Sequence, residues 1–154
     1  MIEDQSIESK KDIFGMIFLL GQRWQTLGDL ELASIGVTTK QWLLLITLHV
    51  FFKDPPTLNQ LTEAMGSSRQ NVKQLASNLQ RSGFLEIFQD AVDKRVLRFR
   101  LTQKNAEIWE ARAQRDQEYI NSLFGDASPQ DILSTRSTLE RLLAISFEKL
   151  RGRP

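Results

Sequence analysis

The chain has 154 residues, 41% hydrophobic and 25% charged, which predicts one soluble globular domain with a proper core. It contains no cysteine and one histidine, which excludes disulfides, thiolate metal sites and zinc sites built from several imidazoles. The net charge of +1 is unevenly spread: residues 68–104 hold eight basic and three acidic residues, whereas the remainder carries a net charge of −4. Such a basic segment is typical of a phosphate-binding surface, although a solvated charged face is the commoner explanation.

The sequence has no pattern typical of a membrane span or a secretion signal. The longest apolar run, WLLLITLHVFF at 42–52, has about half the length that a membrane-spanning helix needs. The N-terminus, MIEDQSIESKKD, is polar and acidic, unlike a signal peptide. We therefore expect a cytoplasmic protein with no membrane partner, no metal and no cofactor.

Helical periodicity dominates the N-terminal third of the chain. Over 10–32 an apolar stripe recurs at helical spacing, formed by Ile13, Ile17, Leu20, Trp24 and Leu27. Gly36 ends this segment, and Thr38 with Gln41 forms the capping-box pattern that opens a second helix. The second helix is apolar nearly all round, so we expect it to be central and buried. The prolines of KDPP end it.

Two short helices with a tight break between them are predicted at 57–83. Thr57 with Gln60, and Ser67 with Gln70, are two further capping-box patterns, one at the start of each helix. Gly66 separates the two helices. Each helix has an apolar inner face, formed by Leu58, Leu61 and Met65 in the first and by Val72, Leu75, Ala76 and Leu79 in the second.

The one strand-like region lies at 84–102 and predicts a β-hairpin whose turn is near 90–94. In its returning strand the apolar and basic side chains take opposite faces, with Leu97, Phe99 and Leu101 on one and Arg98 and Arg100 on the other. A single hairpin is not stable alone, so it must lie against the preceding helices. Two helices, from 102 to about 124 and from 129 onward, complete the chain.

The helix pair followed by a basic hairpin matches a helix-turn-helix with a wing. In such a motif the second helix enters the major groove of DNA, where Arg and Lys suit guanine and Gln and Asn suit adenine. The wing tracks phosphates or enters the minor groove. We expect DNA contacts from Ser67, Ser68, Arg69, Gln70, Asn71, Lys73 and Gln74 on the helix, and from Asp93, Lys94, Arg95 and Arg98 on the wing.

The segments TLNQLTEAMGSSRQNVKQLASNLQRSGFLE and DAVDKRVLRFRLT resemble the MarR family of transcriptional regulators. The wing pattern of that family is Asp-x-Arg, five residues, then Leu-Thr, and Asp93, Arg95, Leu101 and Thr102 match it at full spacing. The specific resemblance covers about 57–105, and the flanking helices agree in order and length. Two departures are Thr62, where the family usually has Ala, and Asn105, near which it usually has Gly.

The resemblance implies a mainly α fold with one β-hairpin, that is, a winged helix-turn-helix with flanking N- and C-terminal dimerisation helices. It implies one domain over 1–154, with a DNA-binding lobe at 38–102 and dimerisation helices at 10–35 and 103–154. The same helical stripes are equally compatible with an intramolecular core. The family resemblance further implies that Arg95 reaches the minor groove and that Asp93 holds it or a neighbouring arginine, whereas the simpler alternative is a weak surface ion pair.

Our hypothesis from the sequence is a sequence-specific transcriptional regulator, a repressor that binds a pseudo-palindromic operator as a homodimer. The resemblance implies a small-molecule effector as a further candidate partner, with no motif to define its site. Trp24, Trp42 and His49 are candidates to line one, although core packing is favoured for Trp42 and a structural or surface position for His49. The alternative is a winged-helix protein–protein module without DNA binding, which the basic segment disfavours. An enzyme is not expected, because no nucleophile–base pair, metal cluster or phosphate loop is present.

Overall fold

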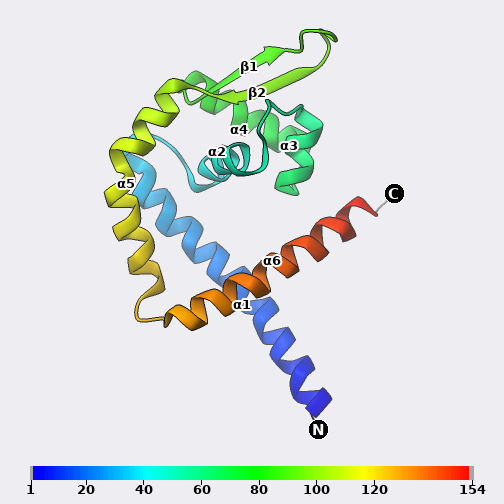
Figure 1. Ribbon diagram of the computed structural model, residues 1–154, viewed down its shortest axis with the longest axis vertical. Helices are drawn as coiled ribbons and strands as arrows, with labels where there is room; N and C mark the ends of the chain where they lie inside the picture. Colours follow the sequence, from blue (N-terminus) through cyan, green and yellow to red (C-terminus); the bar gives the residue numbers. More distant parts are fainter. Residues whose placement is uncertain (1, 153–154) are drawn as a thin grey trace.

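The computed structural model describes the backbone of residues 2–152 and the side chains of residues 6–152. The elements are α1 (Ile2–Leu32), a 3-10 turn (Ala33–Ile35), α2 (Thr39–Phe51), α3 (Leu58–Met65), α4 (Arg69–Arg81), β1 (Leu85–Gln89), β2 (Leu97–Leu101), α5 (Gln103–Phe124) and α6 (Pro129–Arg151). This order confirms the predicted succession of helices and hairpin (Figure 1). Among the described residues, no helix combines the length and apolarity needed to cross a bilayer.

The helix starts follow local capping chemistry. The boxes at Thr38 with Gln41 and at Thr57 with Gln60 form in full, with reciprocal side-chain and backbone hydrogen bonds. The predicted box at Ser67 is wrong, because Ser68 caps α4 by accepting from the backbone N–H of Asn71. A one-residue shift of this kind arises where two serines in succession offer the same capping chemistry.

The first helix is longer than its apolar stripe predicts. It begins at Ile2 rather than near residue 10. The segment 2–9 contains no glycine or proline, and its mostly polar residues can continue a helix without an apolar face. Periodicity therefore detects the part of a helix that packs, and it misses a polar extension.

The hairpin and the three short helices share one core. β1 and β2 pair antiparallel with Ile87 opposite Phe99, and Phe99 is buried among residues of α2, α3 and α4 such as Leu44, Leu61 and Val72. The helix α2 is central as expected, but only one side of it is buried. Its residues Leu43, Val50 and Phe51 remain exposed in the single chain. The winged lobe is thus built around α2, which contacts α1, α3, α4 and β2.

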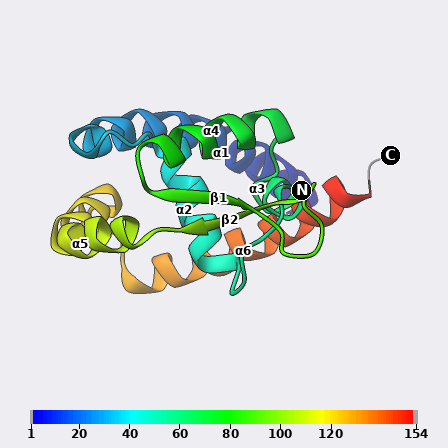
Figure 2. The ribbon, with the colours of Figure 1, turned by 90° about the horizontal axis from the view of Figure 1, so that it is seen from above.

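Three long helices extend away from this lobe. In Figure 1, α5 descends from the hairpin, and α1 and α6 cross below the lobe, whereas Figure 2 shows α1 and α6 on opposite sides. The two helices do not cover each other within the chain, and α6 contains no buried residue. Their apolar side chains are exposed instead, as at Phe14, Phe18, Leu133 and Leu143.

Truncation of a core side chain should show how far the lobe depends on its shared core. Leu61 is fully buried on α3, so Leu61→Ala should lower the free energy of unfolding by about 2–5 kcal/mol. Chemical denaturation followed by circular dichroism measures this change. Val92→Ala, at a side chain 94% exposed, is the control and should change stability by less than about 0.5 kcal/mol. Equal effects of the two substitutions would contradict the assigned core.

Candidate nucleic-acid interface

The outer face of α4 is polar, exposed and anchored at its start. Ser68, Gln70, Lys73 and Gln74 are all exposed, and the opposite face buries Val72. The amide of Asn71 donates to the hydroxyl of Ser67 at 2.8 Å, which ties the first turn of the helix together. The first N–H groups of a helix have no acceptor within it, and apart from the N–H of Asn71, which donates to Ser68, they suit an anionic partner.

The exposed side chains of α4 differ in how far they are already engaged. Arg69 donates to the side-chain oxygen of Asn59 on α3. Gln70 and Lys73 have no hydrogen-bond or ion-pair partner among the described residues, so their donors are available to a ligand. Gln74 donates to Asn78 at 3.2 Å within the helix. Gln70 and Lys73 are therefore the α4 side chains that are most available to bind a ligand.

The wing holds one arginine outward through an aspartate. The guanidinium of Arg95 donates to both carboxylate oxygens of Asp93, at 3.1 Å each, and its backbone N–H donates to the same carboxylate at 3.0 Å. The Arg95 side chain is nevertheless 91% exposed. These hydrogen bonds lower the pKa of Asp93, which accepts them, and raise the pKa of Arg95, which donates them. Geometrically, Asp93 orients Arg95 without covering it.

The two arginines of β2 have different surroundings. Arg100 lies on the outer face, paired with Glu86 at 2.9 Å and stacked 4.6 Å from the ring centre of Phe88. Arg98 is half-buried and donates to Asp90 and to the carbonyl oxygen of Pro55. The hydrogen bond from Arg98, together with two backbone N–H donors, lowers the pKa of Asp90 to about 2. The sequence predicted that Arg98 faces outward, but it did not predict these internal partners.

The two departures from the family pattern, Thr62 and Asn105, have different surroundings. The hydroxyl oxygen of Thr62 is buried and has no hydrogen-bond partner, so this substitution for Ala is not neutral. Asn105 does not use the left-handed backbone that asparagine tolerates. Asn105 lies in the first turn of α5, and its side chain accepts from the indole N–H of Trp109 at 2.9 Å.

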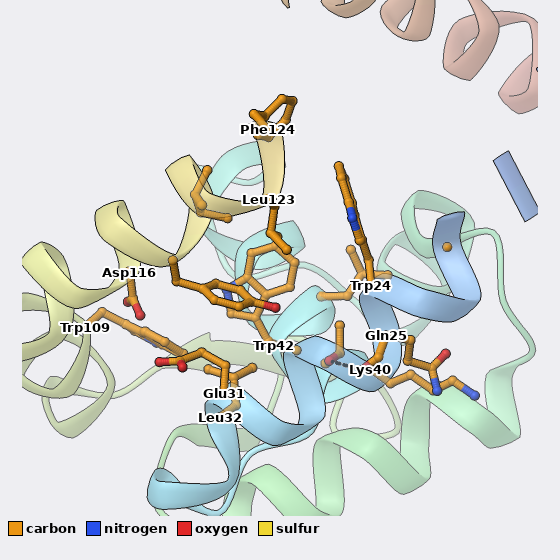
Figure 3. Close-up of a pocket in the computed structure, with 16 residues that line it drawn as sticks. Trp24, Gln25, Glu31, Leu32, Lys40, Trp42, Trp109, Asp116, Leu123 and Phe124 are labelled. Carbon is orange, nitrogen blue, oxygen red and sulfur yellow. Dashed lines mark hydrogen bonds between the residues drawn. The ribbon is translucent and has the colours of Figure 1, made fainter. Parts of the chain in front are cut away.

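An aromatic cavity lies where α1, α2 and α5 meet. Its volume is about 530 Å³, and its lining includes all three tryptophans of the chain, Trp24, Trp42 and Trp109, together with Tyr119 and Phe124. In Figure 3, Trp109 and Asp116 stand at one end of the cavity, while Trp24 and Lys40 stand at the other. This volume is within the range of small-molecule sites, and planar aromatic walls favour a planar ligand.

The carboxylates at one end of this cavity, Glu31 and Asp116, are paired with arginines of α5. Arg112 on α5 is 9% exposed and donates to Glu31 at 2.8 Å and to Asp116, and Arg115 also donates to Glu31. The hydrogen bond from Arg115 is the largest cause of a lowered pKa of Glu31, which burial opposes. The network joins α5 to the last turn of α1, next to Ser34. The cavity therefore presents paired carboxylates rather than free negative charge.

The sequence foresaw part of this arrangement. Trp24 and Trp42 do line the cavity, and Trp42 also packs against the core. His49 lies instead at a neighbouring hollow that shares Trp42 and Trp109. The ion network escaped sequence reasoning because Glu31 and Arg112 are 81 residues apart, and no local pattern links them. No group of three potential metal ligands occurs among the residues that the structure describes.

The chain is similar in sequence or in structure to known transcriptional regulators. No protein-family model matches the chain. The transcriptional activatory protein BadR of Rhodopseudomonas palustris is 25% identical over 142 residues, which are 91% of this chain and 81% of that protein. A MarR transcriptional regulator from Methanosarcina mazei has a TM-score of 0.79 and 17% identity, over 90% of this chain and 98% of its own. A mutant MarR from E. coli complexed with operator DNA has a TM-score of 0.73 and 18% identity, over 86% of this chain and 94% of its own.

The chain thus has a winged helix-turn-helix fold with three long flanking helices. More closely, it has the fold of the MarR-family regulators, which confirms the resemblance in its sequence. The similar proteins are transcriptional regulators rather than enzymes, in agreement with the expected absence of catalysis.

Proposed function

We propose that the protein is a DNA-binding transcriptional regulator of the MarR type. The observation that carries the proposal is the capped helix α4, whose exposed Gln70 and Lys73 are not engaged elsewhere, beside a wing on which Asp93 holds an exposed Arg95. The exposed donors of α4 suit base edges in the major groove, and an arginine at the wing suits the narrow minor groove. The operator complex of E. coli MarR supports this assignment. For the contacts we propose ten of the eleven residues predicted from the sequence, with Gln70, Lys73 and Arg95 foremost. Arg98 is set apart because its guanidinium already binds Asp90 and the carbonyl oxygen of Pro55.

The proposed assembly is a homodimer formed by the long helices. A 23-residue helix gains most of its stability from packing, yet α6 has no buried residue in the single chain. The apolar side chains of α1 are similarly uncovered, so a second copy supplies the missing contacts. We therefore keep 10–35 and 103–154 as dimerisation segments and 38–102 as the DNA-binding lobe. A two-fold axis places the recognition helices on half-sites about 10–10.5 bp apart, or a multiple of that spacing.

The proposal also covers whether the protein represses or activates transcription, and which small molecule controls its binding to DNA. We propose a cytoplasmic repressor that releases DNA when a planar aromatic compound fills the cavity between α1, α2 and α5. That cavity touches both a dimerisation helix and the central helix of the lobe, so an occupant can change the angle between them. Activation of transcription is a second candidate function, because the relative BadR is a transcriptional activatory protein. In vitro transcription from a bound promoter separates the two, because a repressor lowers the transcript and an activator raises it.

Measurements of DNA affinity should distinguish the contribution of the wing to overall binding from the contribution of α4 to base recognition. With duplexes selected from genomic fragments, Arg95→Ala should weaken binding to all sequences by about tenfold, because a wing contact carries little base information. Gln70→Ala should reduce discrimination between bases by about 1–3 kcal/mol. Mobility-shift titrations at several salt concentrations measure both effects. Wild-type affinity of Arg95→Ala would count against the wing role, and absence of any DNA binding would reject the function.

Dimerisation should depend on the exposed apolar residues of the long helices. Phe18→Asp and Leu143→Asp place a charge in the proposed interface and should shift the protein from dimer to monomer. Sedimentation velocity measures the molecular mass of each variant. Val92→Asp changes an even more exposed apolar residue, on the wing, and should leave the dimer intact. A monomeric wild-type protein would disprove the proposed assembly.

The aromatic cavity should be open to a direct binding test, because every tryptophan of the chain lines it. The matched probes 1-naphthol and 1-naphthoate should change the intrinsic tryptophan fluorescence with saturation. Gly21→Leu should abolish this change, since Gly21 lines the cavity and an added Cβ meets no atom within 4 Å. Gly15→Leu, on the same helix and also in open space, is the control. Unchanged fluorescence with wild type at saturating probe, or equal binding by both variants, would remove the cavity from the proposal.

A further inference from the structure

The turn of the wing is built around one carboxylate, that of Asp90. One of its oxygens accepts from the backbone N–H groups of Val92 and Asp93, at 2.9 and 3.0 Å. Its own backbone N–H donates to the carbonyl of Val96 at 2.9 Å, which closes the turn at its base. Asp90 therefore fixes the backbone from which Asp93 and Arg95 project.

The second oxygen of Asp90 is bound by Arg98, which reaches from β2 to two other parts of the lobe. The Nε of Arg98 donates to Asp90, and its Nη1 donates to the carbonyl oxygen of Pro55 at 2.8 Å. Pro55 belongs to the connection between α2 and α3, 43 residues away along the chain. We call these three residues, Asp90, Arg98 and Pro55, the wing brace.

The wing brace is sheltered, and the backbone beside it is tied to the same connection. The Asp90 and Arg98 side chains are 15% and 34% exposed, compared with 91% for Arg95. The N–H of Phe99 donates to the carbonyl of Pro56 at 3.2 Å, and Thr57 forms a β-bridge with Arg98. The brace thus transmits the position of the helical lobe to the far end of the hairpin.

From this geometry we propose that the wing brace is a positioning device for Arg95, and that Arg98 acts through Asp90 rather than as a contact to DNA. The contacts run without a gap from Pro55 to Arg98, to Asp90, to the backbone of Asp93 and finally to Arg95 through the Asp93 carboxylate. This inference rests on the proposed DNA binding, and it revises the predicted role of Arg98.

The brace and a simple effect of charge predict opposite changes in DNA affinity when an acidic residue of the wing is neutralised. Removing an acidic charge near DNA strengthens binding wherever the charge acts only through its field. Asp90→Asn keeps an acceptor for the turn but loses the charge that binds Arg98, so a brace predicts weaker binding instead. Glu86→Gln is the matched control, because Glu86 also pairs with an arginine of the same hairpin but contacts neither the turn nor the α2–α3 connection.

The first experiment measures DNA affinity with a duplex that the wild-type protein selects. Asp90→Asn and Arg98→Gln should each weaken binding about tenfold, and Glu86→Gln should leave it equal or stronger. In an Arg95→Ala background, Asp90→Asn should cause no further weakening, because the brace acts through Arg95. Equal behaviour of Asp90→Asn and Glu86→Gln would overturn the proposal, as would an undiminished effect of Asp90→Asn in the Arg95→Ala background. Thermal unfolding of each variant shows that the fold is retained.

The second experiment needs no DNA, so it separates failure of the brace from failure of the proposed function. Hydrogen exchange of the free protein, followed by NMR, should show the amides of Val92 and Asp93 exchanging about tenfold faster in Arg98→Gln. Arg100→Gln, the neighbouring arginine on β2, is the control and should leave these rates unchanged. Unchanged rates in Arg98→Gln would overturn the brace even in a protein that binds DNA.

Discussion

The burial of Phe99 against the helices of the lobe is the contact on which the arrangement of the winged lobe depends. A two-stranded hairpin has too little internal burial to be stable alone, so its position is set by what it packs on. Phe99 is 1% exposed, and its backbone N–H donates to the carbonyl oxygen of Pro56 in the α2–α3 connection. Once this residue is fixed, the alternation of β2 turns Arg98 and Arg100 to the other face and sets where the turn at Asp90 lies.

Local chemistry explains why so much of this fold could be predicted from the sequence. The capping boxes at Thr38 and Thr57, the stripe on α4 and the alternation of β2 each depend on residues within a few positions of one another. The same kind of reasoning predicted which faces of α4 and the hairpin are exposed. It failed by one residue at Ser67, where two serines compete for the same cap, and at the polar start of α1.

The parts that escaped prediction depend on long-range contacts. Glu31 meets Arg112, Arg98 meets the carbonyl of Pro55, and Trp109 of α5 joins the two expected tryptophans around one cavity. Each requires the tertiary arrangement before the pairing can be seen, because ion pairs and aromatic clusters have no sequence period of their own. Arg98 illustrates the difference: its outward face follows from strand alternation, whereas its partners follow from the packing of the hairpin on the α2–α3 connection.

The pairing of charges on the wing has a consequence for recognition. Asp90 binds Arg98 in a sheltered site, while Asp93 binds Arg95 where water reaches both groups. An exposed ion pair is held weakly, because water and salt screen it, so phosphates or base edges can replace Asp93 as the partner of Arg95 at small cost. A sheltered pair is exchanged less readily, because its partners would be left buried and unmatched. In the proposed DNA complex, the wing would combine a fixed base with an arginine that is pre-oriented and still available, which would reduce the ordering that binding requires.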